Sequence, residues 1–268
     1  MGNPGNSSRD KLISIILPTI RPDLAGAALQ SIVACSDDVR YEIVVVSPFP
    51  VQGKNIVHVK EEVPKGNCAA HAMGYQASSG DIIVAMSDDH IALDGWLTPV
   101  QSFIEQRETQ YFPFCAGINR PQSPWFGAVY GLYYPYFPVL SRQSAEAIGG
   151  FFSPDFTAHF GDPDLAMRVW KAGGGGRCEL LYEANLAPNK LVPTSKESAH
   201  KHTSLEKDLA TFTALYHQDF GRGFSRDLKD INSNYAIHHL RDRTFMARVP
   251  QRHYMAELEQ RHRKALGM

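Results

Sequence analysis

The sequence predicts an α/β domain with a mostly parallel central sheet flanked by helices, followed by a helical C-terminal extension. Short runs of β-branched, fully apolar residues recur through the first hundred residues. Stretches with helical spacing separate them, and this alternation is typical of a parallel sheet covered on both faces. The 268 residues suffice for one large core, and the composition is that of a folded protein.

The first half of the chain contains four predicted strands and two predicted helices. The strands are the apolar runs at residues 12–17, 41–46, 56–59 and 82–86. Residues 23–34 place apolar side chains along one side, and residues 67–78 are rich in alanine, so both predict helices. The order is therefore β-α-β-β-α-β. Neither a GxGxxG nor a GxxxxGK[ST] pattern is present, which excludes a standard dinucleotide-binding fold and a P-loop enzyme.

The second half mixes aromatic loops with helices. A helix is expected from about Leu97 to Arg107, and residues 111–140 are crowded with aromatics and prolines, which indicates strands and loops. Further helices are predicted at residues 144–148, 164–172 and 205–220. From Arg226 onward the chain is charged and predicted to be helical in pieces.

Charge and cysteine content exclude several classes of protein. The formal net charge of −1 argues against a general nucleic-acid binder, which needs a basic field. The cysteines are widely spaced without a CxxC pair, so reduced buried thiols are expected instead of zinc or disulfides. The first nine residues lack the apolar region of a signal peptide, and no run is long enough to span a bilayer. The sequence therefore predicts a soluble cytoplasmic protein.

Asp88 and Asp89 directly follow the fourth predicted strand. Ligands of open α/β sheets bind beyond the carboxyl ends of the strands, so the position suits a binding site. Two adjacent carboxylates are costly without a positive partner, and Mg²⁺ or Mn²⁺ prefers one or two carboxylates plus phosphate oxygens. The alternative is an ordinary surface turn, in which Asp is common.

Asp162 and Asp164 lie at the start of a predicted helix. Acids at a helix N-terminus are favoured by capping and by the helix dipole, which is the structural alternative to a catalytic role. Arg168 is one turn further on and can pair with Asp164. That pairing would make Asp164 structural and leave Asp162 for chemistry.

Together these segments resemble glycosyltransferase family 2, a group of inverting nucleotide-sugar enzymes with a GT-A fold. The resemblance runs through ISIILPT at 13–19, EIVVV at 42–46, GDIIVAMSDD at 80–89, GWL at 95–97, IGGF at 148–151, GDPDLAMR at 161–168 and AG at 172–173. It covers about residues 12 to 220. It implies one GT-A-type domain at residues 11–225, with a nucleotide-binding half at 11–100 and an acceptor half at 101–225, before a basic extension at 226–268.

The resemblance implies a nucleotide site at Pro18, Thr19, Arg21, Ser47 and Asp88. Thr19 would meet the base near the end of the first strand, and Asp88 would bond the ribose. Ser47 stands where the family usually has an Asp that reads the base, so the identity of the nucleotide is open. A UDP-sugar is the expected donor.

The resemblance also implies a metal and a base. Asp89 would hold Mn²⁺ or Mg²⁺ across the diphosphate, and Asp162 aligns with the general base. A His after the last core strand often completes the metal site, and His200 and His202 fit that place, although either is equally a surface histidine. Such a site transfers sugar with inversion to an acceptor hydroxyl, here on a glycan or a lipid-linked acceptor in polysaccharide biosynthesis.

Several positions depart from the family pattern. Ser87 replaces the first acid of the metal motif, His71-Ala72 replaces an Arg-Asn pair, and Gly161 replaces the Glu before the base. A non-catalytic GT-A-like binding or scaffolding subunit is therefore one alternative. A sugar-nucleotide nucleotidyltransferase is a weaker one, because no Gly-rich loop follows the first strand.

Aromatic residues and the basic tail suggest two further contacts. Trp125 and Tyr133 could stack on sugar rings as acceptor-binding residues, and the alternative is that they belong to the core. In the tail, Tyr254, Leu258 and Leu266 lie along one face of a predicted helix. That helix could contact the inner face of a membrane peripherally, or pack on the domain or a second subunit. We predict that it supports a homo-oligomer.

Overall fold

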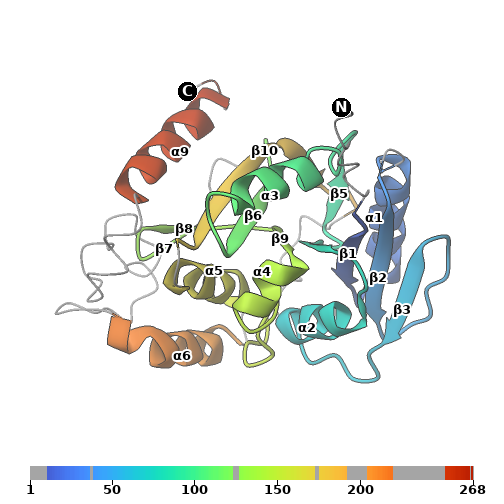
Figure 1. Cartoon of the computed structure of the whole chain (residues 1–268). Coiled ribbons are helices and arrows are strands. Elements are labelled where there is room, and N and C mark those ends of the chain that lie inside the picture. The colour runs from blue at the N-terminus through green and yellow to red at the C-terminus, as the bar shows by residue number, and fades with distance from the viewer. Residues whose placement is uncertain are drawn as a thin grey trace, which may run out of the picture.

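The computed structural model describes residues 11–36, 39–122, 127–172, 175–191, 204–219, 251–265 and 267. Eight strands form one sheet in the order β3-β2-β1-β4-β9-β6-β10-β5, and β7 and β8 form a separate hairpin (Figure 1). Their bounds are β1 Ile13–Pro18, β2 Tyr41–Ser47, β3 Ile56–Lys60, β4 Ile82–Ala85, β5 His90–Ala92, β6 Phe114–Asn119, β7 Gly127–Val129, β8 Leu132–Tyr134, β9 Pro138–Ser141 and β10 Arg177–Pro188.

Most strands of the sheet share one direction. β3, β2, β1 and β4 pair in parallel, β9 is antiparallel to both β4 and β6, and β10 is parallel to β6. Only β9 and the edge strand β5 therefore run against the others among the described strands. The predicted mostly parallel α/β sheet is confirmed, and six strands end at a common edge.

Helices cover both faces because successive strand residues point to opposite sides. Ile15 and Val45 face one core with α1 (Pro22–Ala34) and α3 (Val100–Glu108). Ile16 and Val44 face the other. That second face is covered by α2 Asn67–Ala77, α4 Arg142–Ala147, α5 Gly161–Lys171 and α6 Leu205–Tyr216. In Figure 1, α3 lies above the sheet, and α2, α4 and α5 lie below it.

Close packing of α2 on the sheet depends on one glycine. A Cβ on Gly74 would lie 2.4 Å from Ile16 Cγ2 and 3.2 Å from Val46 Cγ2. These distances leave no room for a side chain. The helix therefore lies directly against β1 and β2, whose ends carry candidate site residues.

Two strands were not predicted. β5 is three residues long, and β10 contains Glu179, Glu183 and Asn185, which obscure its apolar alternation. The register of β10 against β6 also shifts between Leu181 and Asn185. Pairing with a buried neighbour, which local sequence does not reveal, selects strand here.

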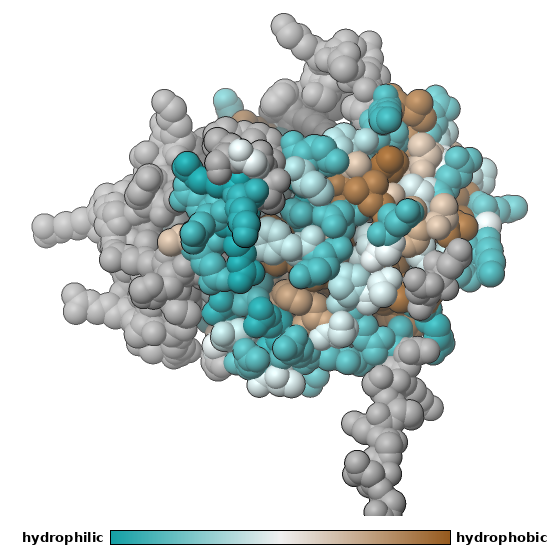
Figure 2. Space-filling model, turned by 90° about the horizontal axis from the view of Figure 1, so that it is seen from above, coloured by the Kyte–Doolittle hydropathy of each residue, from teal (hydrophilic) through white to brown (hydrophobic). Residues whose placement is uncertain are grey.

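The C-terminal extension contains α9 (Gln251–Ala265), which packs on the domain. Leu258 is 1% exposed within the core, and Tyr182 Oη donates to its carbonyl oxygen at 3.5 Å. Figure 2 shows a largely hydrophilic face on this side of the molecule, with small separate hydrophobic areas. None of the described helices has the length and apolar character needed to cross a bilayer.

Candidate functional site

The carboxyl ends of β1, β2 and β4 bring the first candidate residues together. Thr19 follows β1, and its N–H donates to Val46 O of β2 at 2.9 Å. Asp88 follows β4 by three residues and is only 3% exposed. The parallel sheet thus places segments 69 residues apart in direct contact.

Asp88 is held by two of the predicted nucleotide-site residues. Thr19 Oγ1 donates to Asp88 Oδ2 at 2.7 Å, and Arg21 Nε donates to the same oxygen at 3.1 Å. Arg21 Nη2 donates to Asp88 Oδ1, so the guanidinium forms a bidentate interaction with both carboxylate oxygens. Such a fork is a strong, directional interaction. Asp88 is therefore an ion-paired anion, and Arg21 remains partly exposed beside it.

Asp89 is more accessible than Asp88. Its Oδ1 accepts hydrogen bonds from Ser87 Oγ at 2.5 Å and His90 Nδ1 at 2.8 Å, and its side chain is 23% exposed. The His90 ring packs edge-on against Phe137, with centroids 4.6 Å apart. Ser87, which replaces an acid of the family motif, thus orients Asp89.

The donor set fits a metal that is shared with phosphate. Mg²⁺ and Mn²⁺ sites of this kind use one or two carboxylates and complete their shell with phosphate oxygens and water. Asp89 has a partly exposed carboxylate that could serve as one such ligand. The described residues contain no group of three or more His, Cys, Asp or Glu side chains that could hold a metal alone. His200 and His202 lie outside the described residues.

Asn189 braces this edge and was not predicted. It follows β10 and is 4% exposed. Its Nδ2 donates to Asp88 O at 2.9 Å, and its N–H donates to Asp89 O at 2.8 Å. A polar residue at the end of a strand was the available signal, but β10 itself had been missed.

The side chain of Ser47 points into the protein interior. It is completely buried, its Oγ donates to Phe49 O at 2.6 Å, and the same oxygen lies 3.1 Å from His58 Nε2. Pro18, the last residue of β1, is also buried. Of the residues predicted to bind nucleotide, Arg21 is therefore the one with a partly exposed side chain, beside the buried Asp88.

Asp162 lies in the first turn of α5, after Phe160 with a left-handed φ of +62°. Burial of its carboxyl raises its pKa to about 7, and the positive charge of Arg120 opposes that rise. A carboxyl with a pKa near neutrality can exchange a proton under physiological conditions. This property suits Asp162 for the proton transfer that the sequence analysis expected of it.

Asp164 has the partner that the sequence predicted and one that it did not. Arg168 Nε donates to its Oδ2 at 2.9 Å, which confirms the predicted pair. Tyr216 Oη of α6 donates to its Oδ1 at 2.6 Å. Arg168 also donates to the carbonyl oxygens of Ile148 and Gly150. Asp164 therefore ties α5 to its surroundings.

Arg120 and the rings of Tyr134, Tyr136 and Phe137 lie between the two acidic sites, and we call these four residues the Arg120 cluster. The guanidinium carbon of Arg120 lies 4.0 Å from the ring centroid of Tyr136 and 6.0 Å from that of Phe137. Tyr134 Oη donates to Tyr136 Oη at 3.4 Å. Phe137 touches His90 on one side, and the charge of Arg120 acts on Asp162 on the other. All three rings are partly exposed.

The assignment of Tyr133 as an acceptor-binding residue is corrected. Its side chain is 1% exposed and belongs to the core, where its carbonyl oxygen accepts from Trp170 Nε1 at 2.8 Å. A ring without an exposed face cannot stack on a sugar. Trp125 lies outside the described residues.

Two departures from the family pattern are core features. His71 is buried beside Phe152, and burial lowers its pKa to about 4, so it is neutral. A Cβ on Gly161 would lie 2.6 Å from both Cys68 Sγ and Phe152 Cδ1. Packing of Phe152 therefore accounts for both substitutions.

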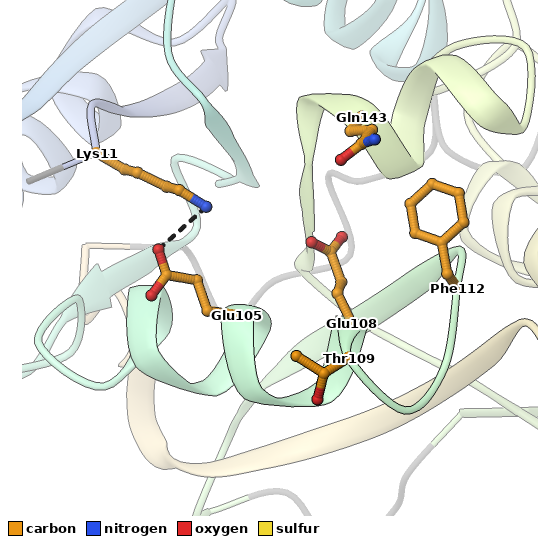
Figure 3. A pocket seen from close by; sticks show the side chains of 6 residues that line it. All are labelled: Lys11, Glu105, Glu108, Thr109, Phe112 and Gln143. Atoms are coloured by element: carbon orange, nitrogen blue, oxygen red, sulfur yellow. Dashed lines mark ion pairs between the residues drawn. The ribbon is translucent and has the colours of Figure 1, made fainter. Parts of the chain in front are cut away.

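A cavity of about 340 Å³ lies elsewhere on the protein. Figure 3 shows its lining, in which Lys11 Nζ pairs with Glu105 at 3.0 Å. Lys11 precedes β1, so this cavity is at the amino end of the strand, away from Asp88. It is not part of the candidate site.

Comparison with solved structures shows the fold. The chain is similar to a mannosyltransferase from Pyrobaculum calidifontis solved with GDP-Man and Mn²⁺, with a TM-score of 0.58 and 14% identity over 97% of this chain and 84% of that one. It is similar to GalNAc-T7 solved with UDP, GalNAc and Mn²⁺, with a TM-score of 0.56 and 11% identity over 92% and 58% of the two chains. For TarS of S. aureus the TM-score is 0.58 and the identity 12%, over 96% and 55%.

These neighbours are all glycosyltransferases, and the chain shares their GT-A-type fold. It spans little more than half the length of GalNAc-T7 and of TarS. No protein-family model and no curated protein matches the sequence.

Proposed function

We propose that the chain is a glycosyltransferase of the inverting kind that its motifs resemble. It would move a sugar from a nucleoside-diphosphate sugar to an acceptor hydroxyl. The observation that carries the proposal is that the Arg120 cluster contacts His90, the partner of the partly exposed Asp89, and also acts on Asp162, whose pKa is raised to about 7. A role in polysaccharide biosynthesis and a cytoplasmic location belong to the same proposal.

The donor half of the reaction would be handled at Asp88. Thr19 and Arg21 hold its carboxylate in place, and Asn189 fixes its backbone. A ribose hydroxyl would bind to this anion, with the exposed side of Arg21 near the diphosphate. Because Ser47 is buried, base recognition would depend on other groups at this edge. UDP-sugars and GDP-sugars are the first donors to test, since the neighbours were solved with each type of nucleotide.

Asp89 is the carboxylate that would hold a divalent cation, with His200 and His202 as further candidate ligands. When bound, Mn²⁺ or Mg²⁺ would stabilise the negative charge that develops on the leaving diphosphate. Ser87 and His90 keep one oxygen of Asp89 hydrogen-bonded and so fix its orientation.

Asp162 would act on the acceptor. Its carboxylate would take the hydroxyl proton while the acceptor oxygen forms a bond to the anomeric carbon and the bond to the diphosphate oxygen breaks. A pKa of about 7 suits a general base at neutral pH. One displacement from the face opposite the diphosphate inverts the anomeric carbon. Tyr134 and Tyr136, rather than the buried Tyr133, would contact the acceptor sugar.

The test is nucleotide release from a panel of UDP- and GDP-sugars, with Mn²⁺ and with EDTA. We expect turnover with at least one donor in Mn²⁺ and none in EDTA. Asp89→Ala should remove activity and the Mn²⁺-dependent rise in melting temperature caused by UDP or GDP. Asp94→Ala, which changes an exposed acid a few residues on, should leave both as they are.

If the protein bound UDP or GDP as tightly in EDTA as in Mn²⁺, the metal assignment would be contradicted. Metal-dependent nucleotide binding without any turnover would instead support the non-catalytic binding subunit.

A further inference from the structure

The turn that leads into Asp162 is held by an acid from a distant helix. Asp208 of α6 is completely buried, and its Oδ1 accepts from Thr157 N–H at 3.0 Å. Its Oδ2 accepts from Ala158 N–H at 3.0 Å and His159 N–H at 2.9 Å. Three consecutive backbone donors therefore converge on one carboxylate, 49 to 51 residues away in sequence.

The contacts keep Asp208 ionised. Burial alone would raise its pKa, but the hydrogen bonds from residues 157–159 outweigh burial and hold the pKa below its ordinary value. A carboxylate that accepts several N–H groups is a strong anchor, because removing it would leave buried donors unsatisfied.

The same turn is fixed on its other sides. Thr157 O accepts from Cys68 N–H at the start of α2 at 3.2 Å. It also occupies the space of a side chain at Gly66, whose added Cβ would lie 2.3 Å away. Beyond the turn, Phe160 has a left-handed backbone and Gly161 lies against Phe152. The backbone from 157 to 161 therefore has little freedom when Asp208 is in place.

We propose that Asp208 is a positioning residue, which fixes the carboxyl of Asp162 by holding the backbone of residues 157–159. The inference rests on the proposed function, since it concerns the base of that reaction. Asp162 follows the held turn by three residues. A general base acts only within hydrogen-bond reach of the proton that it takes, so a small displacement of α5 lowers turnover.

Asp208→Asn tests this role. An amide nitrogen would face N–H donors, so at least one hydrogen bond is lost. We expect kcat to fall roughly 10- to 100-fold, the scale of a misplaced catalytic group, with the affinity for UDP or GDP in Mn²⁺ unchanged. Glu206→Gln makes the same charge change at an exposed position of α6 and should have no effect.

Two readouts separate positioning from simple stability. The acid limb of the pH–rate profile should move below pH 7, because a loosened turn admits water to Asp162, while Arg120, Tyr134 and Cys68 still face it. In addition, Asp162→Asn combined with Asp208→Asn should be no less active than Asp162→Asn alone. If Asp208→Asn does not fold, Asp208→Glu moves the carboxylate by one methylene and should show the same shift with nucleotide binding retained.

Wild-type kcat and pH profile in a folded Asp208 variant would overturn the proposal, and so would additive effects in the double variant. Hydrogen exchange at residues 157–162 gives a result that does not depend on activity: it should speed up in Asp208→Asn, and unchanged exchange also overturns the proposal. An inactive wild-type protein with a protected turn would contradict the proposed function and leave the anchor itself supported.

Discussion

Asp162 shows how a residue suited to chemistry can weaken the fold. Its pKa is about 7 in the folded protein, and an unfolded Asp titrates near 3.9. Between these values the folded state binds more protons than the unfolded state, so this group lowers stability as pH rises through that range. Above pH 7 the whole unfavourable contribution is present, and below about pH 4 it is absent.

Replacing Asp162 should therefore separate activity from stability. We expect Asp162→Asn to lower transfer by about 10²–10⁴, as for loss of a general base. The same variant should melt at a higher temperature than the wild type at pH 8 and at an equal temperature near pH 4. Calorimetry at the two pH values, with Asp155→Asn as an exposed control, measures this. A lower melting temperature for Asp162→Asn than for the wild type at pH 8 would contradict the raised pKa. If Asp164→Asn lost more transfer activity than Asp162→Asn, the assignment of the base would be reversed.

At the scale of elements, close helix contacts decide where a side chain is tolerated. A Cβ added to Gly161 at the start of α5 would lie 2.6 Å from Cys68 Sγ and Phe152 Cδ1, whereas nothing lies within 4 Å of an added Cβ on Gly26 in α1. The two helical glycines therefore should respond to alanine in opposite directions.

We expect Gly161→Ala to destabilise the protein by about 1–3 kcal/mol, because it overpacks the contact of α5 with Phe152. Gly26→Ala should stabilise it by about 0.5–1 kcal/mol, since alanine loses less entropy in a helix. Urea denaturation of both variants measures the free energies. A stabilising Gly161→Ala would mean that Phe152 is not fixed, and that packing does not account for the missing Glu.

The difference between local pattern and tertiary contact explains which elements the sequence could predict. The runs that became β1, β2 and β4 are apolar on both faces, so local pattern sufficed and the Asp88-Asp89 site followed from it. β10 interrupts its apolar residues with Glu179 and Glu183, and one arginine partner of Glu179, Arg107, comes from α3. Asn189 and Asp208 were missed for a related reason: both act on backbone groups that only the tertiary fold brings near.

For the whole molecule, the C-terminal extension contributes to a surface that it shares with α3 and β10. Leu258 enters the core, and Arg261 lies over the Tyr182 ring at 5.9 Å. Glu179 is buried nearby, and its carboxylate pairs with Arg107 Nε at 2.9 Å and with Arg177 Nε at 2.6 Å. α9 thus covers a charged surface of β10. Packing on the domain was one of the alternatives that the sequence analysis gave for this helix.

Removing residues after Val249 should lower the melting temperature by several degrees. Burial of a leucine contributes about 1.5–3 kcal/mol, and Leu258→Ala is the matched single change. Light scattering on the truncated protein also tests the predicted self-association, which requires a fall in the number of protomers per particle. An unchanged oligomeric state together with lost binding to anionic vesicles would favour the membrane alternative instead.

The brace from Asn189 bears on how such a protein can evolve. The two halves that we propose to bind the nucleotide and the acceptor follow each other along the chain, yet a side chain 101 residues downstream donates to the carbonyl of Asp88. The group of residues around Asp88 that we propose as the donor site is therefore complete only when both segments are present. Exchange of donor specificity by recombination would have to carry two distant segments together, whereas point changes around Thr19 and Arg21 leave the brace intact.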